Sequence, residues 1–290
     1  MRFTRRRFSI LAAFIPWAGF AGAAAPQRGV FWRAKFQSHQ LILFGYVRIR
    51  ADYLPDIVAD GKRLIQKTKS VLMDMNPGII FASEEFDNKD LKPVFTALPK
   101  SYQDDLRAVL ATSPAKNAIE KLTGFEAAIL LIGEGQQGFG PDAPSVGLVL
   151  TQYGLSLKRD IKTLASDDEV KALRKPLDAA TVNSVDPSAV TFLLDLRRRV
   201  GPIGGHFDEL YKARNGDEIA RLGEEIAARG VLTPSDFLDA ERLRTLFIER
   251  LARQPAGANA FVILPIGLLS GQHGILNELR SRGAEVTPIA

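Results

Sequence analysis

The segment from Gln40 to Met75 has the sequence QLILFGYVRIRADYLPDIVADGKRLIQKTKSVLMDM, and its pattern decides the fold class. Residues 41–44 form an unbroken apolar run, which is typical of a strand buried on both faces of a parallel sheet. From Leu54 to Ile65, apolar residues recur every three or four positions, which predicts an amphipathic helix with Pro55 in its first turn. Residues 70–75 predict a second strand. The segment is therefore a strand–helix–strand unit with parallel strands.

The loop at residues 45–48 and the end of the second strand lie at the same edge of such a unit. Ligands of open α/β sheets bind beyond the carboxyl ends of the parallel strands. Arg48 in this loop and Asp74 at the end of the second strand are therefore candidate site residues. Neither side chain alone defines a chemical reaction.

The two ends of the chain supply further strands for the sheet. Residues 30–36 alternate between apolar and polar, and the turn at 38–40 predicts a hairpin that adds an antiparallel edge. Residues 260–264 form another continuous apolar run, and residues 285–287 predict a closing strand. We expect an α/β protein with a mixed, largely parallel central sheet flanked by helices, in a single domain that spans residues 26–290.

The middle of the chain has mainly helical periodicity. Residues 154–164 continue a helical pattern, while residues 169–173 are a candidate for another strand of the sheet. Residues 265–271 are interpreted as the loop after the strand at 260–264. The other predicted helices are 101–110 with Ser101-Tyr102-Gln103-Asp104 as its cap, 114–122, 125–132, 189–200, 206–213, 219–226, 237–251 and 274–282, the last ended by Gly283.

The segment Gly133-Glu134-Gly135-Gln136-Gln137-Gly138 matches the G-x-G-x-x-G pattern of dinucleotide-binding loops. That function needs a helix to begin at the third glycine, so that its free N–H groups meet a phosphate. Residues 139–144 contain two prolines and do not supply that helix. We therefore interpret the segment as a flexible loop.

The first 25 residues predict an export signal. A basic stretch precedes an apolar run at residues 10–20, and small residues follow at 21–25. The segment Thr4-Arg5-Arg6-Arg7-Phe8 is similar to a twin-arginine signal. The apolar run is shorter than the roughly 20 residues that a membrane span needs, and Pro16 interrupts it. We therefore expect an exported, periplasmic protein without a stable membrane anchor.

Charge and residue usage exclude several classes of function. Four of the 38 Lys and Arg residues lie in residues 1–25, which contain no acid, so residues 26–290 carry 34 basic and 33 acidic side chains. This balance gives no electrostatic basis for nucleic-acid binding, and we interpret Arg197-Arg198-Arg199 as a solvated basic face. The absence of Cys excludes disulfides, thiolate sites and a lipid-modified Cys. His39 is predicted to be exposed in its turn.

Both ends of the chain resemble the TraB/GumN family, and the resemblance extends over most of residues 29–290. In that family an apolar strand ends in Gly-Thr-x-His, and a helix and a strand ending in Glu follow; these positions here hold Gly45, Tyr46, Arg48 and Asp74. Near its carboxyl end the family has Gly-x-Gly-His-Leu-x-Gly, a helix, Gly and Val-x-Pro. This chain replaces the first Gly by Pro265 and the His by Leu268, and it keeps Gly267, Leu269, Gly271, Gly274, Gly283, Val286 and Pro288.

The resemblance implies where a site lies. Family members are thought to hold a metal with the two His and the Glu, and some relatives act as metal-dependent peptidases. Arg offers no lone pair to a metal and Leu has no donor atom, whereas a catalytic metal normally takes about three protein ligands. We therefore expect no metal cofactor. The equivalent positions here are Gly45, Arg48, Asp74, Gly267, Leu268, Gly271 and, at the best match to a second family Glu, Arg174.

Two hypotheses for the function remain. The first is a degenerate family member: a non-catalytic periplasmic binding or interaction protein, in which Arg48 pairs with Asp74 or binds a small anionic ligand. The alternative is a hydrolase or peptidase that uses a divalent metal at a rebuilt site, such as Asp74 with His273 or His206. We favour the first because three site positions have changed together while the glycines remain. The sequence identifies neither a catalytic residue nor the ligand or partner.

Overall fold

The fold is built around one six-stranded sheet. The computed structural model describes residues 29–76, 90–140, 142–175, 178–232, 238–271 and 274–289. The strands lie in the order β4-β3-β5-β2-β1-β6. Their bounds are β1 (Phe31–Lys35), β2 (Gln40–Tyr46), β3 (Ser70–Met73), β4 (Asp160–Thr163), β5 (Asn259–Pro265) and β6 (Glu285–Pro288).

The sheet is mixed and mostly parallel, as the sequence predicts. Strands β2, β5, β3 and β4 pair in parallel, while β1 pairs antiparallel with β2 and with β6. The predicted hairpin of β1 and β2 is confirmed, but it does not form the edge of the sheet because β6 lies outside β1. The five middle residues of both β2 and β5 are buried, as expected for the centre of a parallel sheet.

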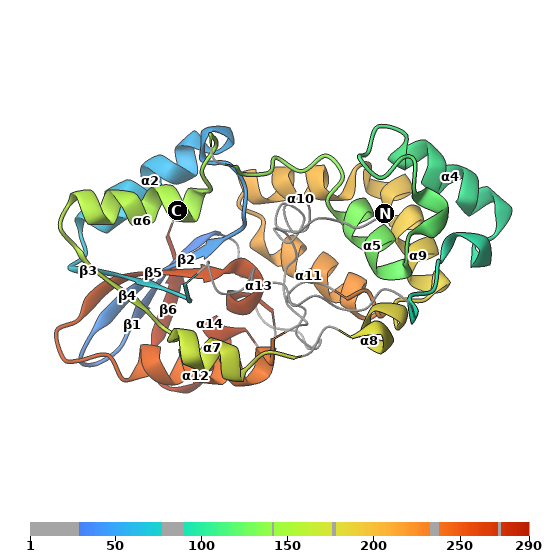
Figure 1. The fold of residues 1–290 in the computed structure, drawn as a ribbon. Helices are drawn as coiled ribbons and strands as arrows, with labels where there is room; N and C mark the ends of the chain where they lie inside the picture. Colours follow the sequence, from blue (N-terminus) through green and yellow to red (C-terminus); the bar gives the residue numbers. More distant parts are fainter. Residues whose placement is uncertain are drawn as a thin grey trace.

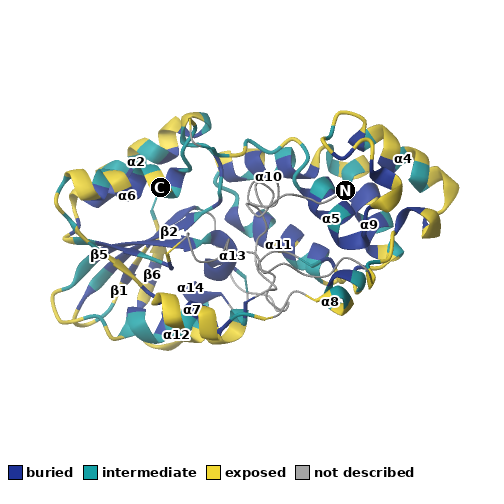
Figure 2. Ribbon diagram, viewed as in Figure 1, coloured by how far each residue is buried: buried dark blue, intermediate teal, exposed yellow. Residues whose placement is uncertain are grey.

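Helices cover both faces of the sheet (Figure 1). Their inner faces are buried and their outer faces exposed (Figure 2). In α2, the buried residues Ile57, Gly61, Leu64 and Ile65 follow the predicted helical period. Figure 1 places α2 (Pro55–Gln66) and α6 (Val146–Ser156) on one side, and α7 (Asp167–Ala172), α12 (Ala240–Ala252) and α14 (Ile275–Ser281) on the other.

A helical region lies at the far end of the molecule from the sheet (Figure 1). The chain enters this region twice, first through α4 (Lys100–Leu110) and α5 (Gly124–Ile132) and later through α8 (Ala179–Asn183) and α9 (Pro187–Val200). Helices α10 (Ile203–Lys212) and α11 (Gly216–Ala227) lie between this region and the sheet. Among the described residues, no helix is both long and apolar enough to cross a membrane.

Two predicted elements in the middle of the chain are wrong. The helix predicted at 154–164 ends at Ser156, Lys158 has a positive φ of 56°, and residues 160–163 form strand β4. The strand predicted at 169–173 is instead helix α7. Ser166 caps this helix and Glu169 bonds back to the Ser166 N–H, so the local capping box decides the structure.

Smaller differences concern turns and helix ends. Helix α4 has Pro99 at its N-cap position, so Ser101 lies inside the first turn instead of capping it. The helix predicted at 114–122 is limited to a short 3₁₀ turn at Ile119–Lys121. His39 is buried rather than exposed: its Nε2 donates to the Leu251 carbonyl at 3.0 Å, and its ring stacks on Phe36.

Candidate functional site

The carboxyl ends of the central parallel strands bring the main candidate residues to one end of the sheet. Tyr46 at the end of β2 is in register with Pro265 at the end of β5, and Met73 in β3 is in register with Ile263. The segments 45–48 and 265–271 therefore leave the sheet at the same end, and Asp74 follows β3 there. This confirms the arrangement predicted for Gly45, Asp74 and Gly267.

Tyr46 and Asp74 form a partly buried hydrogen bond across this end. The Tyr46 hydroxyl donates to Asp74 Oδ2 at 2.9 Å, although β5 lies between their two strands. Asp74 is only 6 % exposed. The phenol is long enough to span the intervening strand, which a Thr side chain at the same position is not. Tyr46 is therefore the direct hydrogen-bond partner of Asp74.

Burial sets the electrostatics of this pair. It is the largest cause that raises the pKa of the Asp74 carboxyl, because the charged form loses its water. It also raises the pKa of the Tyr46 phenol far above its ordinary value, and the neighbouring Asp74 raises it further. The positive charge of Arg48 lowers both pKa values without reversing either shift. Tyr46, Arg48 and Asp74 therefore form one electrostatically coupled group, which we name the sheet-end cluster.

The segment after β2 packs against a short helix that the sequence did not predict. Residues 265–271 contain α13 (Ile266–Leu269), whose residues are all buried. A Cβ at Gly45 would lie 3.0 Å from Ile266 and 3.2 Å from Leu269, so any other residue here would require these side chains to shift by a few tenths of an ångström. Leu268 is 3 % exposed and belongs to the core, and Gly267 is also buried in α13.

Helix α10 holds the same segment from another side. The Tyr211 hydroxyl donates to the Gly45 carbonyl at 2.7 Å and accepts from the backbone N–H of Val47. Both groups belong to the turn that carries Tyr46 and leads to Arg48. Tyr211 is fully buried, and sequence reasoning did not select it. A Tyr on the apolar face of a helix was the available signal, but the sequence does not show that this face meets the end of β2.

The remaining predicted site residues lie in other surroundings. Arg174 follows helix α7, not a strand, and forms an isolated bridge with Leu238. Its assignment to the end of a sheet strand is therefore wrong. Gly271 has a positive φ of 87°, which glycine adopts without strain. His206 lies on α10 near Glu218 of α11, whose pKa is lowered mainly by the hydrogen bond from Arg221 and only slightly by His206. His273 lies outside the described residues.

The glycine-rich loop and the arginine run pair with each other. Arg197 Nε and Nη2 donate to the two carboxylate oxygens of Glu134 at 2.6 and 2.8 Å. This ion pair attaches the loop to α9. The segment is a loop as predicted, and its flexibility stays a prediction. No helix begins at Gly138, which forms a bridge with Ile49, so the helix required for dinucleotide binding is absent at that position.

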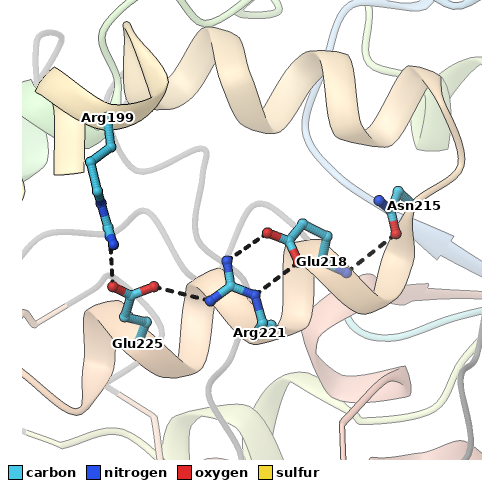
Figure 3. Close-up of polar contacts among 5 residues, drawn as sticks. All are labelled: Arg199, Asn215, Glu218, Arg221 and Glu225. Carbon is cyan, nitrogen blue, oxygen red and sulfur yellow. Dashed lines mark hydrogen bonds and ion pairs between the residues drawn. The ribbon is translucent and has the colours of Figure 1, made fainter.

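The other arginines of this run also have acidic partners. Arg198 pairs with Asp105 and Asp195. Arg199 donates to Glu225 at 2.7 Å and connects α9 to a chain of ion pairs along α11 (Figure 3). The run is therefore a partly exposed set of ion pairs between helices.

The part of the chain that the structure describes contains no group of three or more His, Asp or Glu side chains able to hold a metal ion. The sheet-end cluster itself offers one carboxylate, one phenol and one guanidinium. Such a group binds anions and hydrogen-bonding partners more readily than a divalent cation. Comparison of the chain with family models and with curated proteins finds no match.

Proposed function

We propose that the chain is an exported, TraB/GumN-like binding or interaction protein in which the sheet-end cluster takes the place of a catalytic metal site. The observation that carries the proposal is the hydrogen bond from Tyr46 to Asp74 Oδ2 at 2.9 Å. It uses an oxygen of the carboxylate that stands at the Glu position of the resemblance. The class of ligand follows from the charges around this bond.

The electrostatics of the cluster oppose a divalent cation. A metal ligand has to be ionised, but burial raises the pKa of Asp74 and thereby disfavours the charged form. The fixed charge of Arg48 adds repulsion, since Arg stays protonated at all ordinary pH values. Leu268 supplies no donor atom at the second His position. A small anionic ligand, or an acidic group of a periplasmic partner, suits this end of the sheet better than a metal.

Metal content tests the proposal directly. The parent protein is compared with a variant that carries Tyr46→Thr, Arg48→His, Asp74→Glu and Leu268→His, after identical loading with zinc or manganese and identical dialysis. We expect little metal in the parent and a clear gain in the variant. A matched control carries the same changes except Asp74→Ala, and should lose that gain because it lacks the carboxylate. Near-stoichiometric metal in the parent, lost on Asp74→Ala, would support the rebuilt hydrolase instead.

The export part of the proposal rests on residues 1–25 and has a separate test. Replacement of Arg5 and Arg6 by Lys keeps the charge but removes the twin-arginine pattern. We expect the variant to stay in the cytoplasm while the parent reaches the periplasm, measured by cell fractionation. Unchanged export of the variant would reject the twin-arginine route.

A further inference from the structure

Asp208 is a buried carboxyl group on α10 that the sheet-end cluster does not use. It is 1 % exposed, and its Oδ2 accepts the backbone N–H of Gln137. Its Oδ1 has no hydrogen-bond partner among the described residues. A buried carboxylate oxygen without a partner is unfavourable, and much more so when the group is ionised.

The loop that supplies this N–H is packed tightly onto α10. A Cβ at Gly204 would lie 2.7 Å from the Ile132 carbonyl and 2.9 Å from that of Glu134. The Gly205 N–H donates to the Glu134 carbonyl at 3.0 Å. The contact between α10 and residues 133–137 therefore leaves little room for water to hydrate Asp208 while the loop is in place.

The same loop is bonded to the segment that follows Arg48. The Arg50 N–H donates to the Gln137 carbonyl at 3.1 Å, and Ile49 forms a bridge with Gly138. Asp208 and Tyr211 are one helical turn apart on α10, so one face of this helix contacts both the loop and the turn after β2. We call residues 45–53 and 133–140 together the α10-bound segments.

Within the part of the chain that the structure describes, no positive side chain contributes to lowering the pKa of Asp208. The charged groups on the elements around it lie against other partners. On α10, Lys212 lies over the Tyr53 ring, Glu209 accepts from Tyr53, and His206 lies beside Glu218, which pairs with Arg221. In the neighbouring segments, Arg48 acts on Tyr46 and Asp74, Arg50 pairs with Asp52, and Glu134 pairs with Arg197. Burial, with a smaller contribution from Glu209, raises the pKa of Asp208 to about 7.

We propose that α10 is a proton-dependent clamp on the α10-bound segments: protonated Asp208 holds them in place, and ionised Asp208 loosens them. The clamp regulates access to the sheet-end cluster, and in that respect it rests on the proposed function. Release of the segments lets water reach the carboxylate, which removes the penalty of burying its charge. Acidification therefore tightens the structure around Arg48.

The pH window follows from the two states of Asp208. In the loosened state its pKa returns toward the ordinary value of about 4, while in the closed state it is about 7. Between these values the loosened state binds fewer protons, so opening becomes more favourable as pH rises. The equilibrium constant for opening increases by at most about tenfold per pH unit across this window, and it does not change further above it.

Hydrogen exchange of the intact protein from pH 5 to pH 8, corrected for intrinsic exchange, tests the clamp. We expect protection of the α10-bound segments to fall up to about a hundredfold between pH 5 and pH 7 and then level off. Peptides from β5 serve as an internal reference that stays constant. Asp208→Asn, which cannot ionise, should give a flat profile. Asp195→Asn, which removes an exposed acid on α9, should keep the slope of the parent.

A flat profile in the parent, or the same slope in Asp208→Asn, would overturn the proposal. The parent profile is informative on its own even if Asp208→Asn folds poorly. Hydrogen exchange measures the opening of the α10-bound segments and does not depend on a bound ligand or metal. A result that rejects the clamp would therefore leave the metal analysis of the sheet-end cluster unaffected.

Discussion

The sheet-end cluster and the ion pairs of α9 and α11 use the same kinds of side chain in opposite surroundings. In the cluster, Asp74 is buried and burial raises its pKa. On α11, Glu218 is about a third exposed, and Arg221 lowers the pKa of its carboxyl. Figure 3 shows the second arrangement, in which Arg221 lies between Glu218 and Glu225 and Arg199 reaches Glu225 from α9.

The difference shows that exposure to solvent, and not residue type, decides how much a polar contact contributes to the free energy of unfolding. In an exposed ion pair, each charged group exchanges hydrogen bonds to water for a bond to its partner. The net gain in stability is therefore only about 0–1 kcal/mol. When one partner of a buried polar group is removed, the group that remains is left without a hydrogen bond, and this destabilises the folded state. We therefore expect substitutions in the α9–α11 ion pairs to change stability little, whereas removal of a single polar atom from the sheet-end cluster should destabilise the protein clearly.

The sharpest test of this comparison uses two tyrosines that each donate to an Asp. Tyr46→Phe removes the partly buried bond to the buried Asp74, while Tyr102→Phe removes an exposed bond to Asp195 of 3.0 Å. We expect Tyr46→Phe to lower the free energy of unfolding by about 1–3 kcal/mol, because the buried Asp74 carboxyl loses its hydrogen-bond donor. We expect Tyr102→Phe to change it by less than about 0.5 kcal/mol.

Urea unfolding of both variants at one pH measures the difference. Both substitutions remove the same single oxygen, so side-chain volume and chemistry are matched. Equal effects of the two substitutions would show that Asp74 is hydrated in solution, and the contrast between the two regions would then be wrong.

The central strands were predictable because their signal is local. Strands β2 and β5 are continuous apolar runs, and a buried parallel strand needs that composition. Strand β4 lies at the edge of the sheet, and its residues Asp160-Ile161-Lys162-Thr163 are all at least partly exposed. An edge strand of that composition carries no apolar run, so its sequence merged with the helical pattern before it. The error at α7 has another cause: the apolar residues at 169–173 suit a strand, but Ser166 and Glu169 form a capping box that starts a helix.

The candidate site was predictable in position but not in its contacts. Parallel strand topology brings the ends of β2, β3 and β5 together, and this placed Gly45, Asp74 and Gly267 correctly. The bond from Tyr46 to Asp74 depends on a side chain that reaches across β5, which no spacing in the sequence encodes. Asp208 was missed for a similar reason. A single acid in an amphipathic helix is normally exposed, and only the packing of residues 133–137 buries it.

The smallest predicted effect concerns Glu169, whose pH dependence has the opposite sign to that of Asp208. Hydrogen bonds from Ser166 and Arg250 lower the pKa of Glu169 to about 2. Its contribution to stability is therefore present above the ordinary value of about 4.5 and is lost as pH falls toward 2. Because Glu169 and Arg250 are both 36 % exposed, solvent screening limits the effect to below about 1 kcal/mol.

Glu169→Gln should be slightly less stable than the parent at pH 6, and the gap should narrow at pH 3. Denaturant unfolding at both pH values measures the gap, with Asp168→Asn, an exposed acid on the same helix, as the control. A difference in stability that stays constant with pH would show that the capping contact of Glu169 stabilises the helix without the charge of its carboxylate.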